Sequence, residues 1–299
     1  MRSTVILGTR GSALARAQAD IARQRLEKAN PSLTIETRVI ATAGDRDQHS
    51  SLLVMGGKGV FIREIEQALF DTTIDVAVHS FKDVTAATAP GLQLCAFFSP
   101  ESQADALVLR EGFTFAALPR GALIGTGSMR RRALLTRLRP DLDIRDIRGN
   151  VETRLAKLDS GLYHGVLLSK AGLIRLNLDH RVSHEFDPAV FYPAPGQGVI
   201  ALEIRSGDRR SQAACEAAGD PDQRTRSLAD LGLLRAVGFD CRAPLGVHTT
   251  LAGNDILMRG FIVTTSGNAF VEREMRGSAD DPSSVGARLG AMFLSAPET

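Results

Sequence analysis

Residues 122–132 read ALIGTGSMRRR, and this stretch decides the fold class. It begins with an apolar run of strand length, passes through the glycines of GTGS, and enters a helix-period segment after Ser128. Serine is a preferred helix N-cap, so the stretch predicts a strand that leads directly into a helix N-terminus. Residues 5–15, VILGTRGSALA, repeat this order, with Ser12 as the cap. Strands that alternate with helices in this way predict an α/β fold.

The alternation continues to about residue 204. Hydrophobic periodicity predicts strands at 33–41, 74–79, 122–125, 144–147, 165–169 and 199–204, and helices at 61–70, 129–138 and 151–158. The polar stretch 220–224 is interpreted as a linker. The apolar runs 246–252, 257–264 and 269–275 then predict an antiparallel meander, followed by a helix at 284–293. We therefore expect parallel-rich α/β sheets and a small α+β domain at the C-terminal end.

Composition excludes several classes of function. The 299 residues carry 36 Lys and Arg against 34 Asp and Glu, so the net charge of +2 predicts no overall basic surface for nucleic acid. No apolar run is long enough to span a bilayer, and TVILGT near the N-terminus lacks the pattern of a secretion signal. Three cysteines without CxxC spacing fit a reducing compartment. A cytoplasmic protein without nucleic-acid or membrane partners is expected. His180 and His184 lack a third ligand and predict no metal site.

Cations gather where the predicted strands end, which is where ligands bind in α/β sheets. The residues suited to an anion at these positions are Arg10, Ser12, Lys58, Lys82, Ser128, Arg130, Arg131, Arg148, Arg154 and Arg175. Any one of these arginines would ordinarily be solvated or salt-bridged, but the set together predicts a ligand with several carboxylates or phosphates. Loop 56–59 matches no P-loop, which argues against a nucleotide. Successive helical residues turn by about 100°, so Arg132 is assigned to the surface.

Two other side chains are candidates for chemistry. Asp83 follows Lys82 at a strand end rich in cations, where it either holds Lys82 through a salt bridge or stabilises a positive charge that develops during a reaction. Cys241 lies in the turn-rich GFDCRAP, residues 238–244. A lone cysteine is usually a small buried hydrophobe, whereas a loop position beside Arg242 favours a reactive thiolate. The residues alone leave both pairs of alternatives open.

Taken in order, these segments resemble the porphobilinogen deaminase family. The motifs that carry the resemblance are GTRGSALA at 8–15 with Gln18, GGKGVF at 56–61, VHSFKDV at 78–84, GTGSMRR at 125–131, IRGNVETRL at 147–155, AGLIRL at 171–176 and PGQG at 195–198. One such motif would be weak evidence for a family, but seven motifs in the same order along the chain are specific evidence. The resemblance is strong from about Val5 to Ile204 and thinner beyond, where it rests on Cys241 and on 244–246.

The resemblance implies a fold, a cofactor and a reaction. It implies two lobes like those of periplasmic binding proteins, formed by 1–96 with 193–218 and by 97–192, and a third domain, 219–299, whose Cys241 holds a dipyrromethane cofactor in thioether linkage. Porphobilinogen is then condensed head to tail in four additions: each loses ammonia to give an azafulvene, which the bound chain attacks. Water finally releases hydroxymethylbilane.

The same resemblance assigns roles to individual residues. Asp83 becomes the catalytic carboxylate that stabilises positive charge on pyrrole nitrogen. The strand-end cations and hydroxyls become binders of the cofactor and substrate carboxylates, with Gln18 as a further candidate. A monomer is expected.

One alternative and several departures remain. A non-catalytic two-lobed protein that clamps a polyanionic ligand would explain the arginines, but it gives no role to Asp83 or Cys241. The family pattern has glycines before the attachment cysteine, whereas here Phe239 and Asp240 stand there, and a carboxylate beside a thiol opposes thiolate formation. Val54 and Thr85 also depart from the pattern. Lys170 either adds a cation near the ligand or points to solvent.

Overall fold

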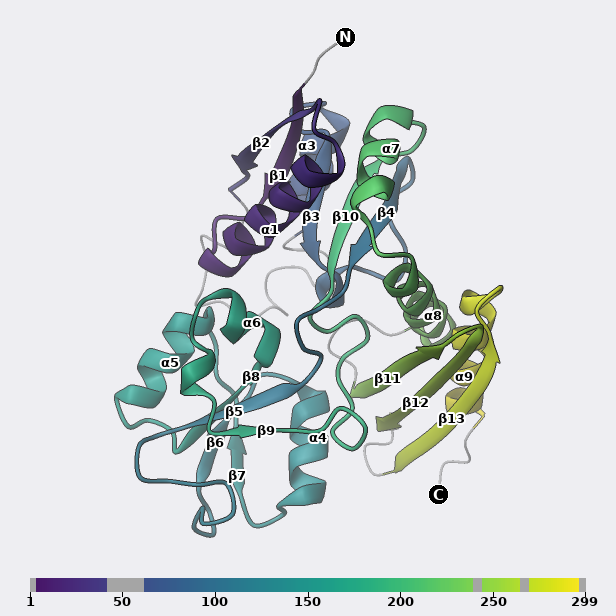
Figure 1. The fold of residues 1–299 in the computed structure, drawn as a ribbon. Coiled ribbons are helices and arrows are strands. Elements are labelled where there is room, and N and C mark those ends of the chain that lie inside the picture. The colour runs from purple at the N-terminus through teal and green to yellow at the C-terminus, as the bar shows by residue number, and fades with distance from the viewer. Residues whose placement is uncertain (1–3, 42–61, 239–243, 264–268, 296–299) are drawn as a thin grey trace. The chain divides into compact units, whose positions relative to one another are not determined.

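The computed structural model describes residues 4–41, 62–238, 244–263 and 269–295 (Figure 1). The chain divides into two compact units. Unit 1 comprises Met1–Pro100 and Val199–Arg224, and unit 2 comprises Glu101–Gly198 and Thr225–Thr299. Lys58 and Cys241 lie outside the described residues.

Unit 1 is built on a five-stranded sheet in the order β2-β1-β3-β10-β4 (Figure 1). Its strands are β1 (Thr4–Thr9), β2 (Thr34–Val39), β3 (Val76–Ser80), β4 (Leu92–Phe98) and β10 (Ile200–Arg205). Its helices are α1 (Ala13–Ala29), α3 (Arg63–Phe70), α7 (Arg209–Ala218) and the short 3-10 helix η1 (Phe81–Asp83). β1 pairs in parallel with β2 and β3, whereas β10 runs antiparallel to β3 and β4.

The alternation of side chains along β3 explains why helices cover both faces of this sheet. Val76 and Val78 belong to the core that includes Ala19, Ala22 and Leu26 of α1 and residues of α7. The intervening Ala77 belongs instead to the core around α3. Successive strand residues point to opposite faces, so a fully apolar strand is buried from both sides.

Unit 2 contains a second five-stranded sheet, in the order β7-β6-β8-β5-β9. Its strands are β5 (Asp105–Leu109), β6 (Leu123–Gly125), β7 (Asp143–Arg145), β8 (Gly165–Ser169) and β9 (His184–Glu185). Its helices are α4 (Met129–Leu138), α5 (Val151–Asp159), α6 (Lys170–Arg175) and the 3-10 helix η2 (Asp179–Arg181). β6 pairs in parallel with β7 and β8, and β5 runs antiparallel to β8 and β9. One reversed strand in an otherwise co-directional sheet thus occurs in both units.

The C-terminal region forms the expected small α+β structure. It consists of α8 (Pro221–Val237), the antiparallel strands β11 (Leu245–Ala252), β12 (Asp255–Val263) and β13 (Phe270–Ser278), and α9 (Pro282–Leu294). These elements share a core of their own. Phe261 of β12 nevertheless packs in the core of the second sheet with Phe186 and Phe191, which explains why the region belongs to unit 2. The division into three domains with the boundaries given above stays a prediction.

The fold class is confirmed, and one local prediction is wrong. Residues 220–224 are not a linker, because α8 begins at Pro221. The Oδ1 of Asp220 accepts a hydrogen bond from the N–H of Gln223 at 3.0 Å. An aspartate cap followed by proline in the first turn is a helix start signal, which the polarity of the stretch concealed. No helix within the described residues combines the length and apolarity that crossing a bilayer requires.

Candidate functional site

The carboxyl ends of β1 and β3 place one group of predicted residues at the same edge of unit 1. Arg10 follows β1, and the hydroxyl of Ser12 caps α1 by accepting a hydrogen bond from the N–H of Ala15 at 3.3 Å. Gln18, which is buried, exchanges two hydrogen bonds with the hydroxyl of Ser80 at the end of β3, at 2.9 and 3.0 Å. α1 is thereby tied to the strand that leads into Lys82 and Asp83.

Asp83 is exposed at the end of a firmly anchored turn. Phe81 of η1 is buried, stacks edge-on against Phe97 with ring centroids 5.1 Å apart, and donates its N–H to the carbonyl of Val199 at 2.9 Å. Lys82 is half-buried, and the carboxylate of Asp83 makes no hydrogen bond or ion pair with any residue that the structure describes. The salt bridge between Asp83 and Lys82, one of the two sequence-based alternatives, is therefore absent from the described residues.

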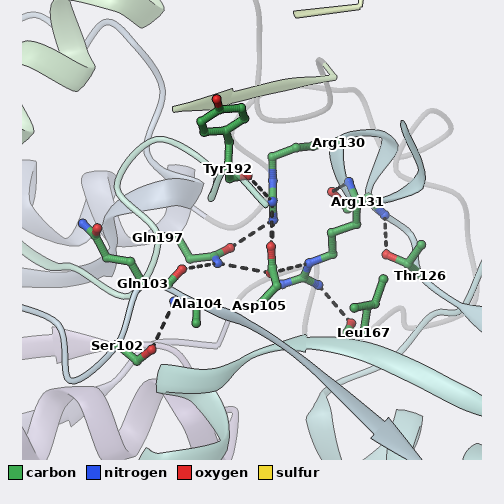
Figure 2. A network of polar contacts seen from close by, with 11 residues as sticks. Ser102, Gln103, Ala104, Asp105, Thr126, Arg130, Arg131, Leu167, Tyr192 and Gln197 are labelled. Carbon is green, nitrogen blue, oxygen red and sulfur yellow. Dashed lines mark hydrogen bonds and ion pairs between the residues drawn. The ribbon is translucent and has the colours of Figure 1, made fainter. Parts of the chain in front are cut away.

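A buried cluster of charges occupies the N-terminal turn of α4 in unit 2 (Figure 2). Ser128 caps this helix by accepting a hydrogen bond from the N–H of Arg131 at 3.4 Å. Arg130 and Arg131 are only 3% and 6% exposed, and both reach Asp105 of β5, which is fully buried. Arg130 binds both carboxylate oxygens, at 2.6 and 3.2 Å, and the Nε of Arg131 binds Oδ1 at 2.8 Å. We call Arg130, Arg131 and Asp105 the arginine cluster.

Further contacts surround the arginine cluster. The side chain of Gln197 donates to Oδ1 of Asp105 at 3.1 Å and accepts a hydrogen bond from Arg130 at 3.2 Å. The carbonyl of Tyr192 accepts another from Arg130 at 2.7 Å, and that of Leu167 accepts one from Arg131 at 3.0 Å. The Nε of Arg130 is also buried, and it has no hydrogen-bond partner among the described residues.

The arginine cluster carries one positive charge in excess, since two guanidinium groups share one carboxylate. Burial alone would raise the pKa of the Asp105 carboxyl, but the charges and hydrogen bonds of Arg130 and Arg131 hold that pKa below its ordinary value. Burial lowers the pKa of Arg131; Asp105 opposes this shift, whereas the charge of Arg130 adds to it. The repulsion between the two guanidinium groups thus acts on the pKa of Arg131 in the same direction as burial.

The other predicted arginines of unit 2 lie at neighbouring strand ends in different environments. Arg148 is exposed, and the Nε of Arg154 on α5 donates to the carbonyl of Gly149 at 2.7 Å. Arg175 at the end of α6 has a side chain only 3% exposed, and it binds the carboxylate of Glu101 at 2.7 Å as well as the carbonyl of Gly198. The structure thus brings Arg130 and Arg131 together and leaves the Arg148 side chain accessible.

The side chains of Arg132 and Lys170 make their contacts with residues outside the arginine cluster. Arg132 binds the carbonyl of Ile144 and the carboxylate of Asp146, in agreement with its assignment to another face of α4. Lys170 is paired with Glu185 in an exposed contact, and neither of the two alternatives given for it is contradicted by this pairing.

Sequence reasoning missed Asp105 and gave no role to Gln197. The signal for Asp105 was a carboxylate at the start of the apolar run ADALVL, residues 104–109. A carboxylate buried in such a strand needs a cationic partner, and Arg130 and Arg131 were already candidates. Gln197 lay within a motif that had been noted only for its resemblance to the family.

The chain is similar to proteins of known family along nearly its whole length. Residues 5–213 match the family described as porphobilinogen deaminase, dipyromethane cofactor binding domain, and residues 225–295 match porphobilinogen deaminase, C-terminal domain. A porphobilinogen deaminase of Roseiflexus sp. (strain RS-1) is 42% identical over 98% of this chain and 97% of that protein. One of Syntrophotalea carbinolica is 40% identical over 98% of this chain and 93% of that protein.

Similarity to solved structures is weaker. A putative methionine-binding lipoprotein of Bacillus subtilis matches with a TM-score of 0.45 and 12% identity, over 73% of this chain and 91% of that one.

Proposed function

Since the chain belongs to the porphobilinogen deaminase family, we propose specific roles in that family's reaction for the residues at its two strand-end edges. The chain is a transferase that condenses porphobilinogen stepwise with loss of ammonia and releases linear hydroxymethylbilane. It uses a dipyrromethane cofactor, the group for which the domain matched by residues 5–213 is described. The family, reaction and cofactor predicted from the motifs are thereby confirmed. The roles of individual residues are proposals.

The arginine cluster is the observation that carries the proposal. Each porphobilinogen unit has an acetate and a propionate group, so the cofactor and the growing chain present several carboxylates. A buried site with one excess positive charge and a buried, unpartnered Arg130 Nε fits such an anion, because charge-assisted hydrogen bonds are strong where water is excluded. We assign Arg130, Arg131 and Ser128 to hold the cofactor.

The remaining binding residues are assigned to the carboxylates of cofactor and substrate. These are Arg10, Ser12, Gln18, Lys58, Lys82, Arg148, Arg154 and Arg175. Arg148 is exposed in the described structure, which suits a residue that meets ligand directly. Arg175 is held by Glu101, so a ligand carboxylate would have to replace or join that contact.

Cys241 is the proposed attachment point of the cofactor, through a thioether. When bound, dipyrromethane supplies a free pyrrole carbon that acts as the nucleophile. The protein's part is to hold its carboxylates still, because a fixed orientation lowers the entropic part of the barrier.

Asp83 is the proposed catalytic carboxylate. An exposed carboxylate on a turn anchored by Phe81, with no partner in the described residues, is available to a cationic pyrrole nitrogen. A fixed negative charge aimed at a developing positive charge stabilises the transition state more than the ground state. A monomeric state and a cytoplasmic location are proposed with these roles.

Replacing Arg131, with Arg132 as the matched control, tests the proposal. Arg131→Leu should reduce cofactor loading or raise the KM for porphobilinogen by at least about tenfold, since a charge-assisted hydrogen bond is lost. Arg132→Leu, one residue along the same helix, should leave both unchanged because Arg132 binds Ile144 and Asp146 instead. Loading is measured by intact mass and KM by steady-state kinetics. Equal effects of the two substitutions would contradict the assignment of the arginine cluster. Purified protein without any covalent pyrrole adduct would favour the non-catalytic binding protein.

A further inference from the structure

The connector formed by residues 192–198 contacts two of the predicted anion-binding arginines. Arg130 binds the carbonyl of Tyr192 and the side chain of Gln197, and Arg175 binds the carbonyl of Gly198. Gln197 also binds Asp105, the carboxylate of the arginine cluster. The connector therefore helps to hold both guanidinium groups, together with Asp105 for Arg130 and Glu101 for Arg175.

The connector makes a tight turn at the point where it carries Gln197. Gly196 and Gly198 flank that residue and adopt positive φ angles of 69° and 81°. Pro195 fixes the backbone before Gly196, and glycine accepts a positive φ without strain, so the turn is defined locally, whereas contacts outside the connector determine where the turn is held. Within the connector, the N–H of Gln197 binds the carbonyl of Ala194 at 2.9 Å.

Asp230 of α8 supplies an outside contact at this point. Its Oδ2 accepts a hydrogen bond from the N–H of Gly196 at 2.8 Å, and its Oδ1 accepts one from the hydroxyl of Thr249 on β11 at 2.6 Å. The carboxyl group is thus shared by a helix, a strand and the connector. α8 and β11 are also the elements that precede and follow the segment with Cys241 in the sequence.

The environment of Asp230 is unfavourable for a charge. The residue is 6% exposed, and both hydrogen-bond donors are neutral groups. Burial raises its pKa to about 6, while the two hydrogen bonds and the charge of Arg226 act in the opposite direction. Burying a carboxyl group here costs free energy that an apolar residue would not cost. We therefore ask what the hydrogen bond between Asp230 and Gly196 contributes to function.

We propose that Asp230 is a positioning residue for the reaction: by holding the N–H of Gly196 it fixes Gln197 against the arginine cluster. In this role it acts through the connector rather than by binding a ligand itself. The inference rests on the proposed role of the arginine cluster. The role requires a hydrogen-bond acceptor for the N–H of Gly196. A carboxylate oxygen is such an acceptor, and so is the oxygen of a neutral amide.

Three substitutions separate this role from a general contribution to stability. Asp230→Ala removes the acceptor for Gly196. Asp230→Asn keeps that acceptor, since its amide oxygen accepts the N–H of Gly196 while its NH₂ donates to the hydroxyl of Thr249. Thr249→Val removes the other hydrogen bond of Asp230 and leaves the contact with Gly196 in place.

Asp230→Ala should reduce cofactor loading or raise the KM for porphobilinogen about tenfold, the effect of losing one ordinary hydrogen bond. Asp230→Asn and Thr249→Val should keep near-normal loading and KM. In hydrogen exchange followed by mass spectrometry, the segment with Gly196 should lose protection in Asp230→Ala alone. Combining Asp230→Ala with Gln197→Ala should add little to either single substitution, because both act through one contact.

Normal loading and KM in a folded Asp230→Ala variant would overturn the proposal. So would an Asp230→Asn variant as impaired as Asp230→Ala, because the charge rather than the acceptor would then matter. If Arg131→Leu itself has no effect on loading or KM, the proposed function of the arginine cluster has failed. If Arg131→Leu is impaired and Asp230→Ala is not, only the positioning role of Asp230 is wrong.

Discussion

Asp105→Asn is the substitution that most directly tests the charge balance of the arginine cluster. The carboxylate of Asp105 accepts four hydrogen bonds: one at Oδ2 from Arg130, and three at Oδ1 from Arg130, Arg131 and Gln197. An asparagine in its best orientation keeps its oxygen at the Oδ1 position. Its NH₂ group then faces the Nη1 of Arg130, so two donors meet where a bond of 2.6 Å existed.

The expected loss of stability follows from these contacts. One charge-assisted hydrogen bond lost accounts for about 1.5–3 kcal/mol. Two buried guanidinium groups also lose their shared counter-charge, and breaking a buried ion pair from one side typically costs about 3–5 kcal/mol in total. We expect the free energy of unfolding to fall by about 3–5 kcal/mol at pH 7.

Urea unfolding followed by circular dichroism measures this loss, and hydrogen exchange of β5 shows whether the loss arises at Asp105. Asp146→Asn is the matched control. It removes the carboxylate partner of Arg132, and because the Asp146 side chain is 62% exposed, it should change stability by less than about 1 kcal/mol.

The pKa of Asp105 is lower in the folded state than in the unfolded state. Its contribution to stability is therefore present above the unfolded-state pKa and is lost as the pH falls through the folded-state pKa. The difference between wild type and Asp105→Asn should therefore stay constant from about pH 5 to 8. A loss below about 1 kcal/mol would refute the view that Asp105 compensates the two arginines.

Three further predictions concern single residues. Cys241→Ser should lack the mass increment of the cofactor, whereas Cys95→Ser and Cys215→Ser, at buried positions, should keep it; the opposite pattern in intact mass would identify another thiol as the attachment point. Asp83→Asn should fold normally by circular dichroism but turn over porphobilinogen at least about 100-fold more slowly, with Asp83→Glu less impaired, and near-normal turnover would remove this carboxylate from the mechanism. The pKa of Asp230 is raised from 3.8 to about 6 by burial, so the folded state favours the protonated form and loses stability as pH rises from 3.8 through 6. Asp230→Asn should therefore gain stability relative to wild type over that range, by up to about 3 kcal/mol in thermal or urea unfolding, and a gain at low pH instead would contradict the assignment.

The sequence predicted most strongly where local signals were complete. The helix 129–138 and the strand 165–169 have the bounds that were predicted, and Ser12 and Ser128 cap their helices as expected. These features depend on nearest neighbours along the chain. β4 and β5 were missed, and the reversed direction of β5 and β10 could not be predicted, because strand direction depends on partners far away in sequence.

The candidate site shows the same limit. Rotation along a helix separated Arg132 from its neighbours correctly, yet it gave no reason to expect that Arg130 and Arg131 meet at one carboxylate. Their side chains are long enough to converge from different angular positions, and the point of convergence, Asp105, comes from another strand. A sequence pattern identifies which residues carry charge, but a buried pairing depends on tertiary packing.

The reversed strand of unit 1 has a consequence for how this chain is made. β10 is the strand that joins β3 to β4, and β4 pairs with no other strand of the described sheet. Residues 99–199 are synthesised between β4 and β10, which takes about 5–20 seconds at ordinary rates of translation. During that interval β3 and β4 expose unpaired backbone groups, and such edges promote aggregation. The strands β5 to β9 of the second sheet all precede residue 199, so a nascent chain that stalls between residues 185 and 199 contains every strand of that sheet but lacks the strand that joins β3 to β4. The core of the second sheet still awaits Phe261 of β12 at that stage.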